Sequence, residues 1–137
     1  MKAEEIEILV KHRMEQARES LNDAKYLIDG ERSSQSIINR AYYAMFYAAL
    51  ALLQSISKTP SKHSGVISLF DTEFVMKGTF EKELSKDFHK AFEMRQRTDY
   101  RIIKPTTSDK AIEVYDKAEN FVDKVQDYLN LGKSRDR

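Results

Sequence analysis

One stretch decides the fold: residues 36–54, which read SIINRAYYAMFYAALALLQ. It contains five alanines and no glycine or proline, and Ser33 or Ser34 just upstream can act as an N-cap. Two faces carry the non-polar side chains. A helix that is apolar or aromatic nearly all round must contact neighbours on at least two sides. We therefore expect this segment to be the central helix of an α-helical bundle. Its apolar stripe is Ile38, Ala41, Met45, Ala48, Ala49 and Leu52, and its aromatic face is Tyr43, Phe46, Tyr47 and Leu50.

The remainder of the chain repeats the helical pattern on both sides of this segment. Apolar residues at steps of three or four predict helices over residues 2–29, 62–77, 79–100 and 109–131, with the central helix ending near Ser57. Gly30 supplies a stop, Pro105 a break, and Thr107 or Ser108 a cap for the last helix. The fold class is all-α, and we expect one domain over residues 1–131 followed by a frayed tail, 132–137.

Composition excludes several functional classes. The chain has 137 residues, a formal net charge of +1 and no cysteine, so it has neither a global basic field nor thiolate ligands. No apolar run approaches the ~20 residues that span a bilayer. The histidines are not spaced with carboxylates as metal ligands. We expect a soluble, cytoplasmic protein with no metal, no cofactor and no membrane partner.

An arginine is set among apolar positions of the expected helix over residues 79–100. Arg95 lies in the middle of a sector of ~120°, and Asp99 lies near its edge. The two residues, one turn apart, can form an exposed ion pair. Alternatively, the arginine lies on a half-buried face that opens on a polar pocket, where it needs a partner. Both interpretations remain open from the pattern alone. The apolar members of the sector are Phe80, Leu84, Phe88, Ala91 and Phe92.

Other candidate binding residues surround this face. His63 stands at a helix start, where an anion is favoured, although a capping or surface histidine has the same position. His12 and His89 are expected to be solvated, and Arg40 is the one charge of the central helix, beside Tyr43. A basic ridge occupies another side of the expected helix over residues 79–100, either as solvated surface or as a surface that follows a phosphate backbone. Its members are Lys82, Lys86, Lys90 and Arg97.

Three segments together resemble one family. They are NRAYYAMFYAALALL (39–53), KHSGVISLFDTEFVMKG (62–78) and RQRTDY (95–100). This combination resembles the HEPN domain superfamily, and more narrowly the small stand-alone members with an R-x4-Y motif. The resemblance implies an up-and-down four-helix bundle with one extra short helix, and a homodimer. It also implies a minimal nucleotidyltransferase as partner in a toxin–antitoxin pair. Active members are metal-independent endoribonucleases with an R-x4-6-H motif and a composite site across the dimer interface.

Carried over residue by residue, the resemblance makes Arg95 the motif arginine, Asp99 its neighbour in the motif, and Tyr100 the residue in place of the histidine. An unshifted tyrosine, with a pKa of about 10, is a poor general base. This favours a binding module for RNA, a nucleotide or a nucleotidyltransferase partner over an endoribonuclease. As an endoribonuclease, the chain would hold the scissile phosphate with Arg95, with Arg40 and His63 near, and a binding module would use the same polar pocket. A purely structural helical dimer is a third interpretation.

The spacing within the motif sets a geometric condition. On a straight helix Tyr100 lies ~140° from Arg95 around the axis. The two side chains can share a site only if the helix ends near Thr98, or if the partner subunit supplies one of them.

Overall fold

The computed structural model describes residues 2–97 and 105–135, with side chains as far as Asn130, and over these ranges the chain forms helices and no strand. In chain order the elements are α1 (Ala3–Asp29), α2 (Ser34–Ser55), α3 (His63–Phe70), the π-helical turn η1 (Asp71–Val75), α4 (Lys82–Gln96) and α6 (Ser108–Arg135). The all-α fold class and the helical bundle expected from the sequence are confirmed.

The centre of the bundle is α2, as the sequence predicts. Ser33 caps this helix, because its Oγ accepts a hydrogen bond of 3.2 Å from the amide of Ser36. The helix packs against α1, α3, α4 and α6. Its small alanines are fully buried, and so is the large ring of Tyr42. Close approach at the alanines lets neighbouring helices cover α2 within a single chain.

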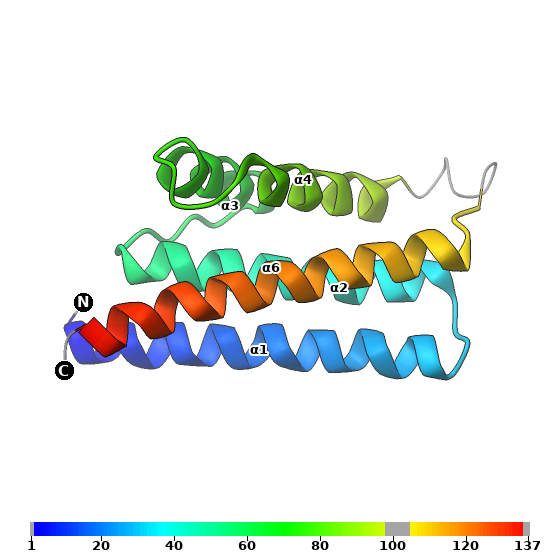
Figure 1. Cartoon of the computed structure of the whole chain (residues 1–137), viewed down its shortest axis with the longest axis horizontal. Coiled ribbons are helices and arrows are strands. Elements are labelled where there is room, and N and C mark those ends of the chain that lie inside the picture. Colours follow the sequence, from blue (N-terminus) through cyan, green and yellow to red (C-terminus); the bar gives the residue numbers. More distant parts are fainter. Residues whose placement is uncertain (1, 98–104, 136–137) are drawn as a thin grey trace.

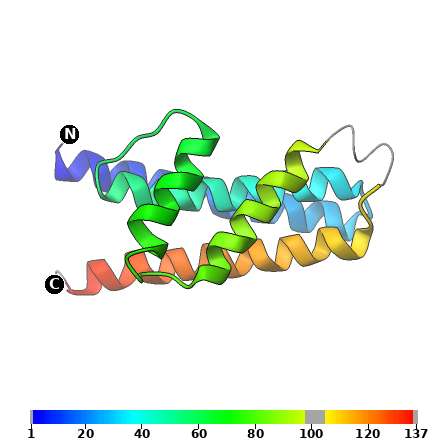
Figure 2. The same ribbon diagram turned by 90° about the horizontal axis from the view of Figure 1, so that it is seen from above.

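The helices form two layers. In Figure 1, α1, α2 and α6 run alongside one another, while α3 and α4 lie above them. Viewed from above in Figure 2, α3 and α4 cross the long helices obliquely, and both ends of the chain lie at the same end of the molecule. Through His63 and Arg95, the first turn of α3 and the last turn of α4 contact the tyrosines of α2.

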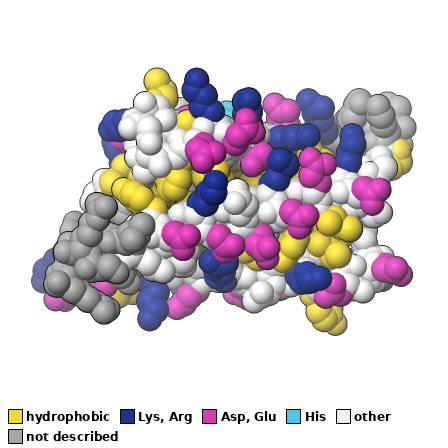
Figure 3. Space-filling view, viewed as in Figure 1, with side chains coloured by type: hydrophobic (Ala, Val, Ile, Leu, Met, Phe, Trp, Pro, Cys, Tyr) yellow, Lys and Arg dark blue, Asp and Glu magenta, His cyan; other side chains and the backbone are white. Residues whose placement is uncertain are grey.

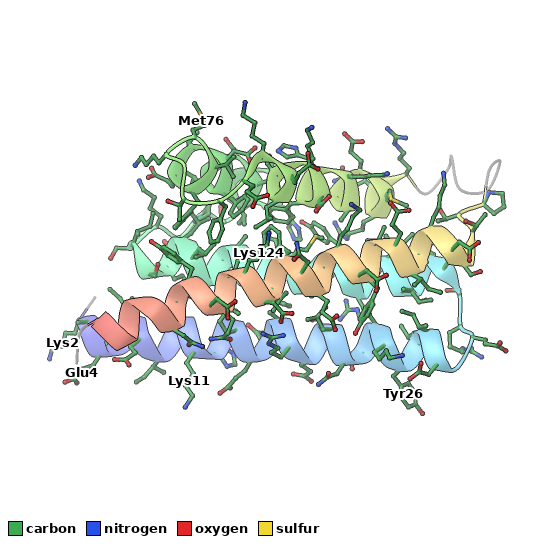
Figure 4. The ribbon with its side chains drawn as sticks, viewed as in Figure 1. Lys2, Glu4, Lys11, Tyr26, Met76 and Lys124 are labelled. Carbon is green, nitrogen blue, oxygen red and sulfur yellow. The ribbon has the colours of Figure 1, made fainter. Side chains whose placement is uncertain are left out.

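The apolar face predicted for the helix over residues 79–100 is the face of α4 that packs inward. Leu84, Phe88 and Ala91 are buried, and Phe80 and Phe92 pack half-buried against the core. By contrast, Tyr26 and Met76 are 79% and 77% exposed and point away from the body in Figure 4. Among the helices that the structure describes, none combines the length and the hydrophobicity of a membrane span.

Several helix ends differ from the sequence-based expectation. The helix expected over residues 62–77 consists of two elements: the α-helix α3, followed directly by the π-helical turn η1. There Asp71 reaches α4: its Oδ1 accepts from Ser85 Oγ at 2.7 Å, and its Oδ2 lies 2.6 Å from His89 Nε2. These contacts are tertiary, and π turns of this kind insert one residue into a helix. The side chain of His89, expected to be solvated, is 48% exposed and contacts the Asp71 carboxylate.

The helix expected over residues 79–100 is shorter than expected at both ends. Gly78 has a φ of +82°, and the amides of Thr79 and Phe80 bond back to the Phe74 carbonyl, so α4 begins only at Lys82. At the other end, Arg97 leaves the helix with ψ of 56°. The α6 helix extends past Leu131 to Arg135, and Thr107 Oγ1 accepts from the amide of Lys110 at its start.

Candidate functional site

Arg95 lies against the aromatic rings of α2. Its guanidinium carbon is 5.3 Å from the ring centroid of Tyr42 and 5.1 Å from that of Tyr43. Nη2 also donates a hydrogen bond of 3.0 Å to the hydroxyl of Tyr43. Cation–π contacts of this kind stabilise a half-buried arginine without neutralising its charge. The arginine therefore keeps a positive charge at the surface of an apolar layer.

His63, the first residue of α3, reaches the same rings. Its Nδ1 lies 2.7 Å from the hydroxyl of Tyr42. The imidazole stacks on Phe46, with 4.3 Å between ring centroids and 18° between planes. Pro60 packs against the first turn of α3, where a Cβ on Gly65 would meet the proline Cβ at 3.3 Å. The lack of a side chain at Gly65 thus allows the loop at Pro60 to lie close against the first turn of α3.

The electrostatics of this group favour a neutral imidazole. Burial lowers the pKa of His63, and the positive charge of Arg95 lowers the same pKa further. Burial also raises the pKa of the Tyr42 hydroxyl well above its usual range. At neutral pH the site therefore consists of a charged guanidinium, an uncharged imidazole and a protonated phenol.

These side chains form one unit, which we call the arginine–aromatic cluster. Its members come from α2, α3 and α4, and Phe92 completes it, with its ring centroid 5.7 Å from that of Tyr42. A positive charge beside a half-buried hydrogen-bond donor suits an anion, and stacked rings suit a planar base. The arginine–aromatic cluster consists of Tyr42, Tyr43, Phe46, His63, Phe92 and Arg95.

Arg40 extends the cluster toward the start of α2. Its guanidinium carbon lies 5.0 Å from the Tyr43 centroid, so Tyr43 has an arginine contact from both α2 and α4. Nε and Nη2 of Arg40 donate to Asn39 Oδ1 at 3.2 and 2.8 Å. An open depression of about 510 Å³ borders these two side chains, with Leu27, Ser33, Gln35 and Ser36 as its remaining lining.

The basic ridge is a separate surface. Lys86 pairs with Glu83 at 3.3 Å, and Arg97 with Glu93 at 3.5 Å. Over the described part of the chain, neither Lys82 nor Lys90 forms an ion pair, and both are exposed. Figure 3 shows that basic and acidic side chains are interspersed on the face it presents, rather than gathered into one basic patch.

The structure brings four of the candidate residues into contact: Arg40, Tyr43, His63 and Arg95. Asp99 and Tyr100 lie outside the described residues. Sequence reasoning did not single out Tyr42, the residue that joins His63 to the arginine. Its spacing from Ile38 and Met45 marks it as a core position, and a hydroxyl at a core position is itself a signal that a polar partner is near.

Comparison with known proteins assigns the family. The HEPN domain family model matches residues 10–128. A "UPF0332 protein" of Thermotoga maritima is 39% identical over 89% of this chain and 92% of its own length. Two proteins of Methanocaldococcus jannaschii, each named "Putative toxin", are 36% and 32% identical, over 92% and 85% of this chain and 90% and 78% of their own lengths. Since the matched region contains every element from α2 to α4 and most of α1 and α6, this chain belongs to the HEPN domain family.

Proposed function

We propose that this protein is the toxin-like member of a two-component system and binds RNA or a nucleotide through the arginine–aromatic cluster. The observation that carries the proposal is that Arg95 is half-buried and pairs with no carboxylate among the described residues. Its partner in the described part of the chain is the neutral hydroxyl of Tyr43. A half-buried guanidinium needs an anion to compensate its charge, and a phosphate suits its planar donor geometry. The relatives named as toxins support this assignment.

We further propose that the protein acts as a cytoplasmic homodimer and that a minimal nucleotidyltransferase is its partner. Part of α2 supports a dimer: Tyr43, Phe46 and Tyr47 are only partly buried, on one side of the helix. Most of the other apolar surface of α2 is covered within the single chain. The dimer would therefore form through this aromatic strip, which adjoins Arg95, and not through the whole central helix.

The test is a binding measurement with a fluorescein-labelled single-stranded RNA of about 12 nucleotides and with 5′-AMP. Arg95→Ala should weaken binding about tenfold or more, the effect of losing one charge-assisted contact. Arg95→Lys should lose part of the affinity, because a lysine lacks the planar donor pair. The matched control is Arg18→Ala, since Arg18 is an exposed arginine of α1 that pairs with Asp123. If Arg95→Ala binds both probes as the parent does, the proposed site is wrong.

A second candidate function is metal-independent cleavage of RNA. The position of His63 favours it, because an imidazole lies in the same cluster as the motif arginine. Cleavage should persist in EDTA, leave a cyclic phosphate end and disappear in Arg95→Ala. Tyr100→His should raise it, with a rate that falls below about pH 6.5 as the new imidazole protonates. Robust cleavage by the unmodified protein, lost in Arg95→Ala with the dimer intact, would make this the preferred function.

A further inference from the structure

The buried hydroxyl of Tyr42 has one hydrogen-bond partner among the described residues. The side chain is fully buried, and its raised pKa keeps the phenol protonated. A buried O–H group that donates no hydrogen bond loses the full benefit of its hydration in water. Among the described residues, the one acceptor bonded to this hydroxyl is Nδ1 of His63, at 2.7 Å. Tyr42 therefore donates to His63 and not the reverse.

This bond selects the tautomer of His63. An Nδ1 atom that accepts a hydrogen bond carries a lone pair, so the proton of the neutral ring is on Nε2. Stacking on Phe46 holds the ring plane and fixes the direction of that N–H. Nε2 has no hydrogen-bond partner within the described residues. The imidazole thus presents one oriented donor.

The charges around the imidazole keep it uncharged. From α2 it faces Tyr42, Tyr43 and Phe46, from α4 it faces Arg95, and Lys62 precedes it in the chain. Within the described ranges no carboxylate contacts it, so no negative charge stabilises an imidazolium. His89, by contrast, faces the carboxylate of Asp71. The two histidines of the second layer therefore lie in opposite electrostatic settings.

We infer that Arg95 and a neutral His63 form a two-donor site for a phosphate group. The guanidinium supplies the charge, and the Nε2–H of His63 donates a hydrogen bond to a second phosphate oxygen. This inference rests on the proposed function, which places a phosphate at Arg95. It adds that His63 is a fixed donor held by Tyr42 and does not serve as a general base. The phosphate can belong to an RNA backbone or to a mononucleotide.

The tautomer is measured directly by long-range ¹H–¹⁵N correlation spectra of ¹⁵N-histidine-labelled protein. At pH 7.5 Nδ1 of His63 should show the shift of an unprotonated nitrogen and Nε2 that of a protonated one. Spectra of His12→Gln and His89→Gln assign the remaining two histidines. In Tyr42→Phe, which keeps the ring but removes the donor, the tautomer preference should fall and the imidazole should titrate at higher pH. An Nδ1–H tautomer in the parent would overturn the inference.

The donor role is measured by binding of the single-stranded RNA and, separately, of 5′-AMP. His63→Ala should weaken binding about tenfold, whereas His63→Gln, whose amide can replace the Nε2–H donor, should retain most of it. His12→Ala is the matched control, because His12 is an exposed histidine of α1. Loss for both probes identifies the shared phosphate as the ligand group. Loss for RNA alone identifies a backbone phosphodiester, and loss for 5′-AMP alone a terminal phosphate.

The pH dependence separates a fixed donor from a titrating group. The RNA phosphodiester does not titrate between pH 6 and 8, so RNA affinity of the parent should change less over that range than RNA affinity of Tyr42→Phe. In Tyr42→Phe it should rise as the pH falls, because an imidazolium can then form. A parent affinity that rises toward pH 6 as steeply as that of Tyr42→Phe, and becomes flat in His63→Gln, would show a titrating histidine and overturn the inference. Normal binding by His63→Ala beside defective Arg95→Ala would remove His63 from the site but leave the proposed function standing. Normal binding by both would overturn the two together.

Discussion

Arg95 at the end of α4 donates a hydrogen bond of 3.0 Å to the hydroxyl of Tyr43 on α2, across a gap of 52 residues in the chain. The same guanidinium lies 5.1 Å from the centroid of the Tyr43 ring. One tyrosine thus holds the arginine by its ring and by its hydroxyl. Because the hydroxyl is neutral, the arginine is oriented but keeps its charge available for a ligand.

Removing the Tyr43 hydroxyl should disturb the orientation of the Arg95 guanidinium and leave its charge unchanged. Tyr43→Phe keeps the ring contact and deletes the acceptor, so we expect the free energy of unfolding to fall by about 1 kcal/mol, the net value of one hydrogen bond. RNA affinity should fall several-fold, because the guanidinium is less well oriented. Denaturant unfolding and fluorescence anisotropy measure the two effects. Tyr115→Phe is the control, since Tyr115 bonds to Glu119 on the exposed side of α6. Equal effects of the two substitutions on RNA affinity would contradict a role for Tyr43.

The lowered pKa of His63 makes stability depend on pH. The folded protein holds the pKa of this imidazole below its ordinary value, so the unfolded chain takes up the proton more readily. The free energy of unfolding should therefore be fully retained above about pH 6.5 and should decrease as the pH falls below it. His63→Gln should remove that part of the decrease, and His12→Gln should not. Thermal unfolding between pH 7.5 and 5.5 measures the difference.

A second pH effect occurs in a different range and serves as an internal reference. The hydrogen bond from Lys77, with the nearby charge of Lys58, holds the pKa of the Glu73 carboxyl below 4.5. The contribution of Glu73 is present above that value and is lost as the pH falls through its lowered pKa. A decrease in stability that begins only below about pH 4.5 would mean that His63 does not contribute.

The basic ridge should bind an RNA backbone through its two lysines without ion-pair partners in the described structure. Lys82→Gln with Lys90→Gln should weaken RNA binding and reduce the slope of log K against log salt by up to about two, with little sequence preference. The matched double variant is Lys86→Gln with Arg97→Gln, whose parent side chains pair with Glu83 and Glu93. It should have the smaller effect. Unchanged binding by the first variant would leave the ridge as solvated surface.

The dimer should dissociate when a charge is placed on the aromatic strip. Tyr47 is partly buried on α2, and Tyr47→Asp would bury an unpaired carboxylate in the proposed interface. Sedimentation at micromolar concentration should show the parent at twice 16.0 kDa and the variant shifted toward the monomer. Ile8→Asp is the control, because Ile8 is 67% exposed on α1. A parent that sediments only at 16.0 kDa would exclude the dimer.

The central helix and the arginine on the inner face could be predicted because both depend on spacing within one helix. The alanines of α2 predict close helix packing, and Arg95 follows Phe88 and Phe92 at helical intervals. The π turn could not be predicted, since it accompanies contacts of Asp71 with Ser85 and His89, two partners on another helix. The same holds for the bond between His63 and Tyr42. Side chains far apart in sequence meet only when the helices are packed, and no local pattern encodes that distance.

The arginine–aromatic cluster takes its side chains from three helices, and this affects the free energy of local opening. Tyr42, His63 and Arg95 belong to α2, α3 and α4, so any local opening that lifts α3 or α4 from α2 also takes the site apart. A ligand that requires the intact cluster binds the closed form alone. Its occupancy must then raise the free energy of that opening by RT ln(1 + [L]/Kd). The amides of α3 and α4 would consequently exchange their hydrogens more slowly in the presence of a bound phosphate than in its absence.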